Sequence, residues 1–159
     1  MGQYYKLVNA TKKQYIRSWD IACGAKLWEW CANRAAGIFP YLLRKSTGLG
    51  GGDPVISVDW LNKDQSNKWR ETFRNTYPLC GSWAGDSVYL IGDYDDDNPE
   101  LYYVEDNGEW TDISSQLTEE YNHFIEVEDL KIGERERNTK AFPVSTMFIK
   151  PDGIISSER

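Results

Sequence analysis

The chain opens with a pattern of strand-forming side chains. Residues 3–8 (QYYKLV) combine aromatic and aliphatic side chains, and residues 14–16 (QYI) follow a short polar stretch. Aromatic and β-branched residues favour extended backbone, and two such runs joined by a few polar residues are typical of a hairpin. We therefore expect the chain to begin with a β-hairpin.

A helix is predicted over residues 20–36. Its apolar positions cover most of a helix surface: Cys23, Leu27, Trp28, Trp30, Cys31 and Ala35. The polar residues Lys26, Glu29 and Asn33 fall at i, i+3 and i+7, so they share one stripe. A glycine and then a proline follow, as expected where a helix ends. The pattern predicts a largely buried central helix with only this stripe in solvent.

Two further helices are predicted in the first half of the chain, over residues 38–45 and 59–77. The apolar face of the longer one carries Leu61, Trp69, Phe73 and Thr76. Its opposite face carries Lys63, Arg70 and Arg74 at i, i+7 and i+11, so these three cations share one stripe. This basic stripe can receive an acidic ligand, or it is a solvated helix face that balances acidic residues elsewhere.

The second half begins with strand patterns. Residues 87–91 have a clear strand pattern, and a second strand is predicted over residues 101–105. The acidic residues between them are therefore expected at the tip of a long hairpin. Residues 110–113 are a candidate third strand.

A last helix is predicted to begin at Ser114 or Ser115, either of which can cap it, and to run to Glu126. Its inward positions are Leu117, Tyr121, Phe124 and Ile125. Near the C-terminus, the apolar residues 142–149 and 154–155 flank Pro-Asp-Gly, which is typical of a tight turn. A second hairpin is expected there.

The order of these elements indicates the fold class. Strands and helices come in groups rather than in strict alternation, which favours an α+β fold over a parallel α/β fold. The 159 residues, of which 40% are hydrophobic, suit one core. We expect a single α+β domain over residues 1–159, with an antiparallel or mixed sheet packed against about three helices.

Charge is unevenly distributed along the chain. The net charge of −7 divides into +6 over residues 1–85, −15 over residues 86–136 and +2 over residues 137–159. A block of negative charge repels phosphate backbones, so nucleic acid is excluded as the expected partner. The acidic residues either face a basic partner protein or a cation, or form a solvated surface partly balanced by the basic first half.

The cysteines and the apolar runs bear on location. Three cysteines, without a CxxC pair, indicate neither a disulfide framework nor a zinc ribbon, and a reducing compartment is the simpler setting. No apolar run approaches the roughly 20 residues of a membrane span, and the N-terminus lacks the build of a secretory signal. We expect a cytoplasmic protein without a membrane partner. The sequence does not indicate an oligomeric state.

The candidate metal site is an acidic loop that begins at residue 92. Asp93, Asp95 and Asp97 follow the 1, 3, 5 spacing of a calcium loop, with Asp96 between them. The match then ends, because Asn98 replaces the glycine that an EF-hand requires at position 6. A weak Ca²⁺ or Mg²⁺ site is one interpretation, and a hairpin tip kept soluble by charge is the other.

A second candidate is the turn at residues 81–86. Two glycines bracket Trp83 and the turn closes on Asp86, so it can present an aromatic ring and a carboxylate together. The alternative is structural, with Trp83 in the core and Asp86 holding the turn. The single histidine, His123, follows Glu120 at i+3, a pair that we interpret as a surface contact within the helix.

Two resemblances accompany these motifs. The opening GQYY with Leu7, Val8 and Asn9, the LWE of residues 27–29, and the WAGD and GDY of residues 83–94 resemble a family of hypothetical proteins without an assigned activity. Residues 85–125, a Gly-Asp turn followed by an acidic hairpin and a helix, are similar to the second half of Smi1/Knr4-like immunity proteins. That second resemblance implies a toxin as the protein partner.

The sequence thus favours a non-catalytic binding module that contacts a protein partner through the acidic hairpin and exposed aromatic side chains. Two alternatives remain. One is a hydrolase in which Asp86, Asp93 and Asp95 hold Mg²⁺ or Mn²⁺. The other is a small-molecule pocket lined by Trp and Tyr, with the basic stripe of residues 63, 70 and 74 at its rim.

Overall fold

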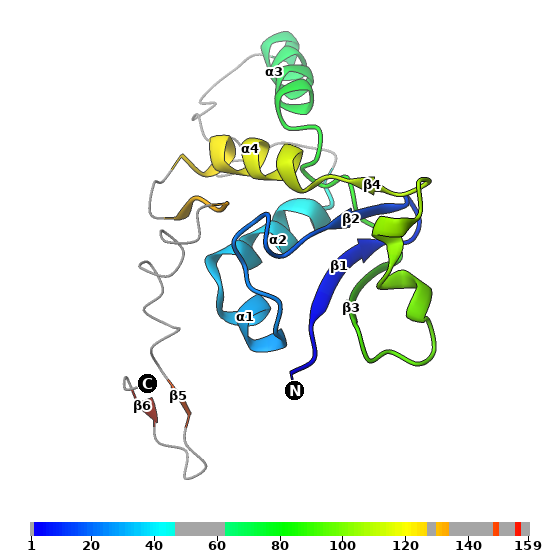
Figure 1. Cartoon of the computed structure of the whole chain (residues 1–159). Helices are drawn as coiled ribbons and strands as arrows, with labels where there is room; N and C mark the ends of the chain where they lie inside the picture. The colour runs from blue at the N-terminus through cyan, green and yellow to red at the C-terminus, as the bar shows by residue number, and fades with distance from the viewer. Residues whose placement is uncertain (1, 47–62, 127–129, 134–147, 150–154, 157–159) are drawn as a thin grey trace.

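A four-stranded mixed sheet lies at the centre of the computed structural model, which describes residues 2–46, 63–126, 130–133, 148–149 and 155–156. The strands are β1 (Tyr5–Asn9), β2 (Gln14–Ile16), β3 (Val88–Gly92) and β4 (Thr111–Asp112), in the spatial order β3-β1-β2-β4 (Figure 1). β1 is antiparallel to both β2 and β3, whereas β2 and β4 run parallel. The predicted N-terminal hairpin is confirmed.

The helices and the remaining short elements complete the fold. The α-helices are α1 (Leu27–Ala32), α2 (Ile38–Leu43), α3 (Lys63–Thr76) and α4 (Ser114–Ile125). The 3-10 helices are η1 (Arg34–Gly37), η2 (Pro99–Leu101) and η3 (Val104–Asp106). Near the C-terminus, β5 (Phe148–Ile149) pairs antiparallel with β6 (Ile155–Ser156), as expected of a hairpin there.

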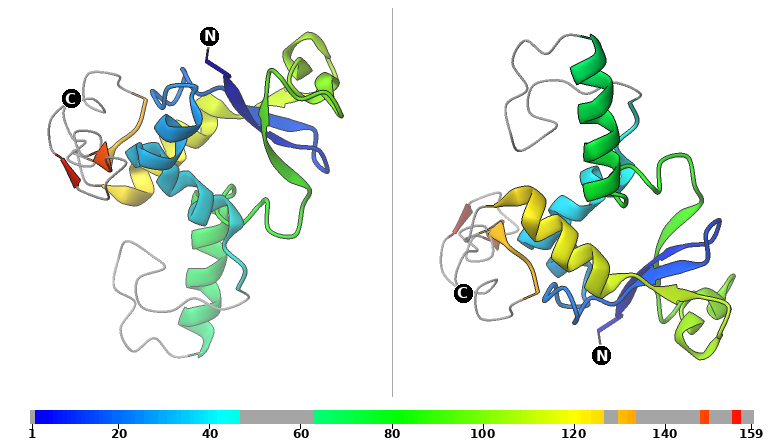
Figure 2. Two further views of the ribbon diagram at one scale, coloured as in Figure 1. Left: turned by 90° about the horizontal axis from the view of Figure 1, so that it is seen from below. Right: turned by 90° about the horizontal axis from the view of Figure 1, so that it is seen from above.

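One face of the sheet carries the main core. Successive side chains of a strand point to opposite faces, so Leu7 of β1 faces the same side as Ile16, its partner on β2. Both pack with Trp30 of α1, Leu42 of α2 and Leu117 of α4, all nearly inaccessible to solvent. The views in Figures 1 and 2 place these three helices together on this side. The predicted α+β fold, a mixed sheet against about three helices, is confirmed.

The opposite face of the sheet carries a smaller core. Val8, Tyr15 and Ile91 alternate with the residues of the main core along their strands, and they pack against Val104 of η3. The segment that holds η2 and η3 therefore covers this face of the sheet.

The helix α3 extends away from the sheet (Figure 2). Phe73 is buried, and its ring and that of Tyr77, just after the helix, lie 6.4 and 5.5 Å from the ring of Phe124 on α4. Thr76, predicted to face inward, is exposed. Leu61 and the side chain of Trp69 lie outside the described part of the chain.

The predicted helix over residues 20–36 is wrong in its extent, because α1 has only six residues. Ala22 and Gly24 adopt left-handed backbone (φ 55° and 82°), which ends any helix before α1. The Glu29 carboxylate accepts hydrogen bonds of 2.8 Å from the backbone N–H groups of Ala25 and Lys26, and so caps α1. Leu27, Trp28 and Cys31, predicted to be buried, are exposed.

The predicted strand over residues 101–105 is also wrong, so the expected acidic hairpin does not form. Within the described residues, β3 pairs with β1 alone, and the segment folds into η2 and η3 instead of extending the sheet beside β3. Val104 of η3 packs against Val8, Tyr15 and Ile91 on a face of the sheet, which buries its side chain without strand pairing. Pro99 stands in the first turn of η2, where its fixed φ suits a helix start. The strand predicted at residues 110–113 does form, as β4.

The helix α4 has the predicted position but a different start. Ile113 occupies the N-cap position, and neither serine caps the helix. The Ser114 hydroxyl instead accepts a hydrogen bond of 2.8 Å from the backbone N–H of Arg17. This contact ties the start of α4 to the residue after β2.

Candidate functional site

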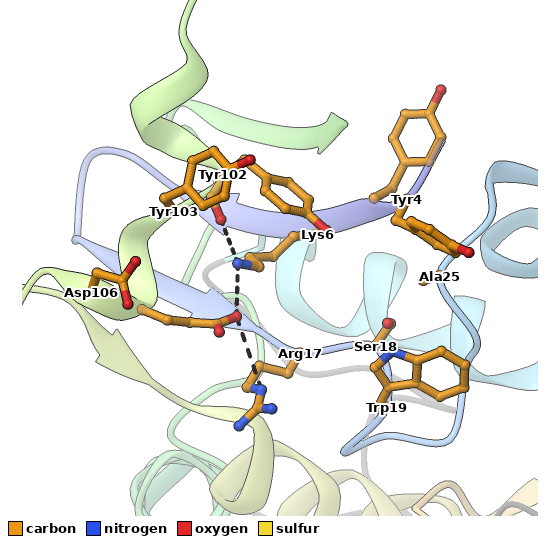
Figure 3. A pocket seen from close by; sticks show the side chains of 11 residues that line it. Tyr4, Lys6, Arg17, Ser18, Trp19, Ala25, Tyr102, Tyr103 and Asp106 are labelled. Carbon is orange, nitrogen blue, oxygen red and sulfur yellow. Dashed lines mark hydrogen bonds and ion pairs between the residues drawn. The ribbon is translucent and has the colours of Figure 1, made fainter. Parts of the chain in front are cut away.

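A pocket of about 430 Å³ lies where the start of β1, the turn after β2 and the segment of η2 and η3 meet (Figure 3). The residues that line it are Tyr4, Tyr5, Lys6, Arg17, Ser18, Trp19, Ala25, Tyr102, Tyr103, Glu105 and Asp106. Figure 3 shows Tyr102 and Tyr103 on one side, Trp19 on the other, and Lys6 and Arg17 between them. Aromatic walls with a few charged groups are typical of ligand sites of this size.

Lys6 forms the floor of this pocket. The alternation of β1 puts its side chain on the face of the smaller core, beside Val8, and Lys6 is only 9% exposed. Its ammonium group donates to the carbonyl of Tyr102, lies 2.7 Å from Glu105 Oε1 and lies 4.5 Å from the centroid of the Tyr102 ring. Because a buried charge is costly unless it is paired, these contacts fix η3 against β1.

Arg17 shares the carboxylate of Glu105 with Lys6. Its Nε lies 3.9 Å from Glu105 Oε1 and 3.6 Å from Asp20 Oδ2. Each of the two cations of the pocket is therefore already close to a carboxylate of the chain itself.

Exposed aromatic rings surround the pocket. Tyr4 is 43% exposed, Trp19 58% and Tyr103 56%. The Tyr103 ring lies 5.2 Å from the more buried ring of Tyr102, nearly at a right angle to it. Burial raises the pKa of the Tyr102 hydroxyl, and the negative charges of Asp93 and Glu105 raise it further. The pocket therefore lies close to several carboxylates.

These carboxylates belong to residues 86–112, which we call the acidic segment. It contains ten Asp and Glu residues and neither Lys nor Arg. Three of its carboxylates pair with lysines of the N-terminal hairpin: Asp86 with Lys12 at 2.6 Å, Glu105 with Lys6 at 2.7 Å and Glu109 with Lys13 at 2.7 Å. Within the described residues, no ion pair joins the exposed side chains of Asp96, Asp97, Glu100 and Asp106 to a cation.

The structure does not assemble the candidate metal loop. Asp93 Oδ1 accepts a hydrogen bond of 2.9 Å from the Tyr4 N–H, and Asp95 Oδ1 accepts one of 2.7 Å from the Asn98 N–H. Asp97 is exposed. Across the described part of the chain, no three His, Cys, Asp or Glu side chains are placed to hold a metal ion together.

The carboxylates of the hydrolase hypothesis do not converge either. Asp86 and Asp93 flank opposite ends of β3, whose ends pair with Asn9 and Tyr5 of β1. Four residues of strand span about 13 Å. Asp86 Oδ2 is bound by Asn9 Nδ2 at 2.8 Å and by Lys12 at 2.6 Å, so this carboxylate serves the turn.

The turn at residues 81–86 has the structural role that we gave as its alternative interpretation. Trp83 is 1% exposed, and its indole N–H donates to Gln14 Oε1 at 2.7 Å. The ring is therefore part of the core and is not presented to a ligand. The hydrogen bond from Asn9, and then that from Lys12, hold the pKa of Asp86 below its usual range.

The basic stripe of α3 lies apart from the pocket. Arg74 is exposed, Arg70 is half-buried and the side chain of Lys63 lies outside the described residues. Neither Arg70 nor Arg74 lines the pocket. A pocket lined by Trp and Tyr therefore exists, but the charged groups that line it are Lys6, Arg17, Glu105 and Asp106.

A buried polar cluster joins α2, α4 and the chain before β3. Glu120, predicted to lie on the surface, is 8% exposed; its carboxylate accepts hydrogen bonds from the Tyr41 hydroxyl at 2.5 Å and the Leu79 N–H at 3.0 Å. Nearby, His123 Nδ1 lies 2.7 Å from the Tyr77 hydroxyl. Each of these side-chain groups has a hydrogen-bonding partner within the chain, which indicates a structural role for the cluster.

The residues of the pocket were not found from the sequence. Lys6 stands inside a strand pattern and Glu105 inside an apparent second strand, and the two are 99 positions apart. Only the fold brings them together. The one local signal for Lys6 was its position between Tyr5 and Leu7 in a predicted strand, where lysine is depleted.

None of the helices that the structure describes combines the length and apolar character of a membrane span. Comparison of the chain with models of known protein families, with curated proteins and with solved structures gave no match. The two resemblances noted above therefore stay predictions from the sequence.

Proposed function

We propose that this protein is a non-catalytic interaction module that binds a basic partner protein through the acidic segment and the aromatic side chains beside it. One observation carries the proposal. In the part of the chain that the structure describes, the exposed carboxylates of Asp96, Asp97 and Glu100 form no ion pair, and they belong to the same segment as two exposed tyrosine rings.

The charge of the acidic segment favours a basic surface as its partner. Opposite charges on two proteins steer their encounter and select the partner, and the effect reaches about 8 Å at physiological ionic strength. The lysines of the N-terminal hairpin are occupied by Asp86, Glu105 and Glu109. Asp96, Asp97 and Glu100 are exposed and form no ion pair within the described residues, so they are available to a partner.

The aromatic side chains supply the apolar part of such an interface. Tyr94 and Tyr103, both 56% exposed, belong to the acidic segment itself. Tyr4, 43% exposed, is tied to the same surface, because its N–H donates to Asp93 Oδ1 and its carbonyl accepts from the Asp93 N–H. Tyrosine is among the residues that contribute most to binding at protein interfaces.

The cysteines agree with action in the cytoplasm, which is part of the proposal. All three are free thiols, at Cys23, Cys31 and Cys80. Free thiols persist in a reducing compartment.

The test compares three forms of the protein as affinity baits in extract of the native host, with quantitative mass spectrometry of the captured proteins. One bait is the wild type. The second carries Asp96→Asn, Asp97→Asn and Glu100→Gln in the acidic segment. The third is a matched control with the same change in net charge, Glu71→Gln, Glu119→Gln and Glu126→Gln, at exposed positions elsewhere.

We expect the wild type and the control to capture the same basic protein and the acidic-segment variant to lose most of it. Equal capture by all three baits contradicts the proposal, because the acidic segment then contributes nothing specific. Loss with both variants also contradicts it, since net charge alone would explain the binding.

A further inference from the structure

We propose that the pocket beside Tyr102 receives a cationic side chain, arginine or lysine, of the partner protein. This inference rests on the proposed function and names the chemical group that the partner contributes. It follows from the ion pairs of the charged groups of the pocket and from the exposure of its aromatic rings.

The two cations of the pocket do not call for an anionic ligand. The ammonium group of Lys6 is held by the Tyr102 carbonyl, the Glu105 carboxylate and the Tyr102 ring. Its side chain is only 11% exposed. Arg17 Nε lies within 4 Å of carboxylates of both Glu105 and Asp20. Bound as they are, both cations are neutralised by the chain itself.

The groups that the pocket exposes to a ligand are those that bind a cation. Asp106 lines the pocket, is exposed and forms no ion pair within the part of the chain that the structure describes. Tyr4, Trp19 and Tyr103 line the same pocket with 43 to 58% of their surface exposed (Figure 3). Aromatic faces combined with a carboxylate are the chemistry that recognises guanidinium and ammonium groups.

The chain itself already binds one cation in this way. Lys6 lies over an aromatic ring and contacts a carboxylate and a carbonyl, all within the segment that also supplies Tyr103 and Asp106. The balance of charge points in the same direction. In the lining, Lys6 and Arg17 balance Glu105 and Asp106, and the negative charge around the site comes from Asp20, 3.6 Å from Arg17, and from the rest of the acidic segment.

The test titrates the ¹⁵N-labelled full chain with N-acetyl-L-arginine amide and follows the backbone and indole N–H signals by NMR. N-acetyl-L-citrulline amide, a neutral compound of nearly the same shape, is the control ligand. We expect the arginine compound to shift signals of Tyr4, Trp19 and Tyr103, and the citrulline compound to leave them in place. Equal shifts with both compounds, or no shift at the pocket, overturn the inference.

Paired variants locate the site. We expect Trp19→Ala and Asp106→Asn each to weaken binding of the arginine compound about two- to fivefold, the effect of one exposed cation–π or charge contact. The controls are Trp28→Ala, at a tryptophan of similar exposure outside the pocket (54%), and Asp97→Asn, outside it in the acidic segment. Equal weakening by the controls, or tighter binding of N-acetyl-L-glutamate amide than of the arginine compound, also overturns the inference.

The result is separable from that for the proposed function. If the acidic-segment variant loses the partner but the arginine compound does not bind the pocket, the inference is wrong and the proposed function stands. If the arginine compound binds but the acidic-segment variant keeps the partner, the proposed function is wrong instead.

Discussion

The hydroxyl group of Tyr41 donates a hydrogen bond of 2.5 Å to the carboxylate of Glu120, joining α2 to α4 inside the core. The same carboxylate accepts from the Leu79 N–H, so one side chain holds together three segments that are distant in sequence. Burial raises the pKa of Glu120 above its ordinary value of 4.5, and the hydrogen bonds from Tyr41 and Leu79 partly oppose this rise. A buried carboxylate in the core makes the stability of the fold depend on pH.

The sign of this dependence follows from the raised pKa. A group that binds its proton more tightly in the folded state stabilises the fold below its unfolded pKa, and this contribution is lost as the pH rises through the folded value. We therefore expect the free energy of unfolding of the wild type, relative to Glu120→Gln, to fall as the pH is raised from about 4 to about 8. Urea denaturation over this range measures it. The exposed neighbour variant Glu119→Gln should show no such difference, and a flat difference for Glu120→Gln would show that the carboxylate does not titrate as argued.

Removing the donor tests the same hydrogen bond without changing the carboxylate. Tyr41→Phe leaves the buried Glu120 with one fewer hydrogen bond, and we expect a loss of about 1–3 kcal/mol in the free energy of unfolding near neutral pH. In addition, the pH dependence should become steeper, because the carboxylate loses a group that stabilises its charged form. A variant as stable as the wild type would mean that the hydrogen bond contributes nothing net.

Trp83 offers a test of the turn at residues 81–86. Its ring is buried and its indole N–H is paired with Gln14, so Trp83→Ala should lower the free energy of unfolding by about 3–5 kcal/mol. The matched change Trp28→Ala, on a side chain that is 54% exposed, should stay within about 0.5 kcal/mol. Chemical denaturation of both variants decides the matter. Similar losses at the two positions would be incompatible with the placement of Trp83 in the core.

The cap of α1 depends on the conformation of Gly24. This residue has φ +82°, and a Cβ atom there would lie 2.6 Å from Glu29 Oε2, the oxygen that accepts from Ala25 and Lys26. We expect Gly24→Ala to cost more than about 1 kcal/mol of stability, since both the backbone and the cap are disturbed. Thermal unfolding of the variant measures this cost. Gly108→Ala, where a Cβ atom would meet no neighbour within 4 Å, is the control. A neutral Gly24→Ala would rule out this account of the cap.

The sequence was most informative where neighbours along the chain determine the structure. The hairpin of β1 and β2 and the position of α4 follow from local patterns of apolar residues. The segment at residues 101–105 has the composition of a strand, but strand propensity depends on how the side chains pack against their neighbours. Val104 packs against Val8, Tyr15 and Ile91 as part of a 3-10 helix on a face of the sheet, and this contact follows only from the complete topology.

Two polar residues of the predicted central helix show the same limit. The polar residues Glu29 and Asn33 have the spacing of a solvent-facing stripe on a long helix. In the structure, Glu29 caps α1 and Asn33 Oδ1 accepts from the Ala35 N–H at the start of η1.

The candidate site was predicted only in part. The acidic character of residues 86–112 was evident from composition. The pocket depends on the contact of Lys6 with Glu105 across two distant segments, and no local pattern encodes that contact.

The measurement that tests the central claim most directly is a calorimetric titration at several salt concentrations. The basic protein captured by the wild-type bait is purified and titrated into the wild type and the two charge variants. We expect the affinity of the wild type and of the Glu71, Glu119 and Glu126 variant to fall steeply with added salt. The Asp96, Asp97 and Glu100 variant should bind more weakly at low salt and show a shallower dependence. The same affinity and the same salt dependence for all three proteins would contradict the claim that the acidic segment binds the partner.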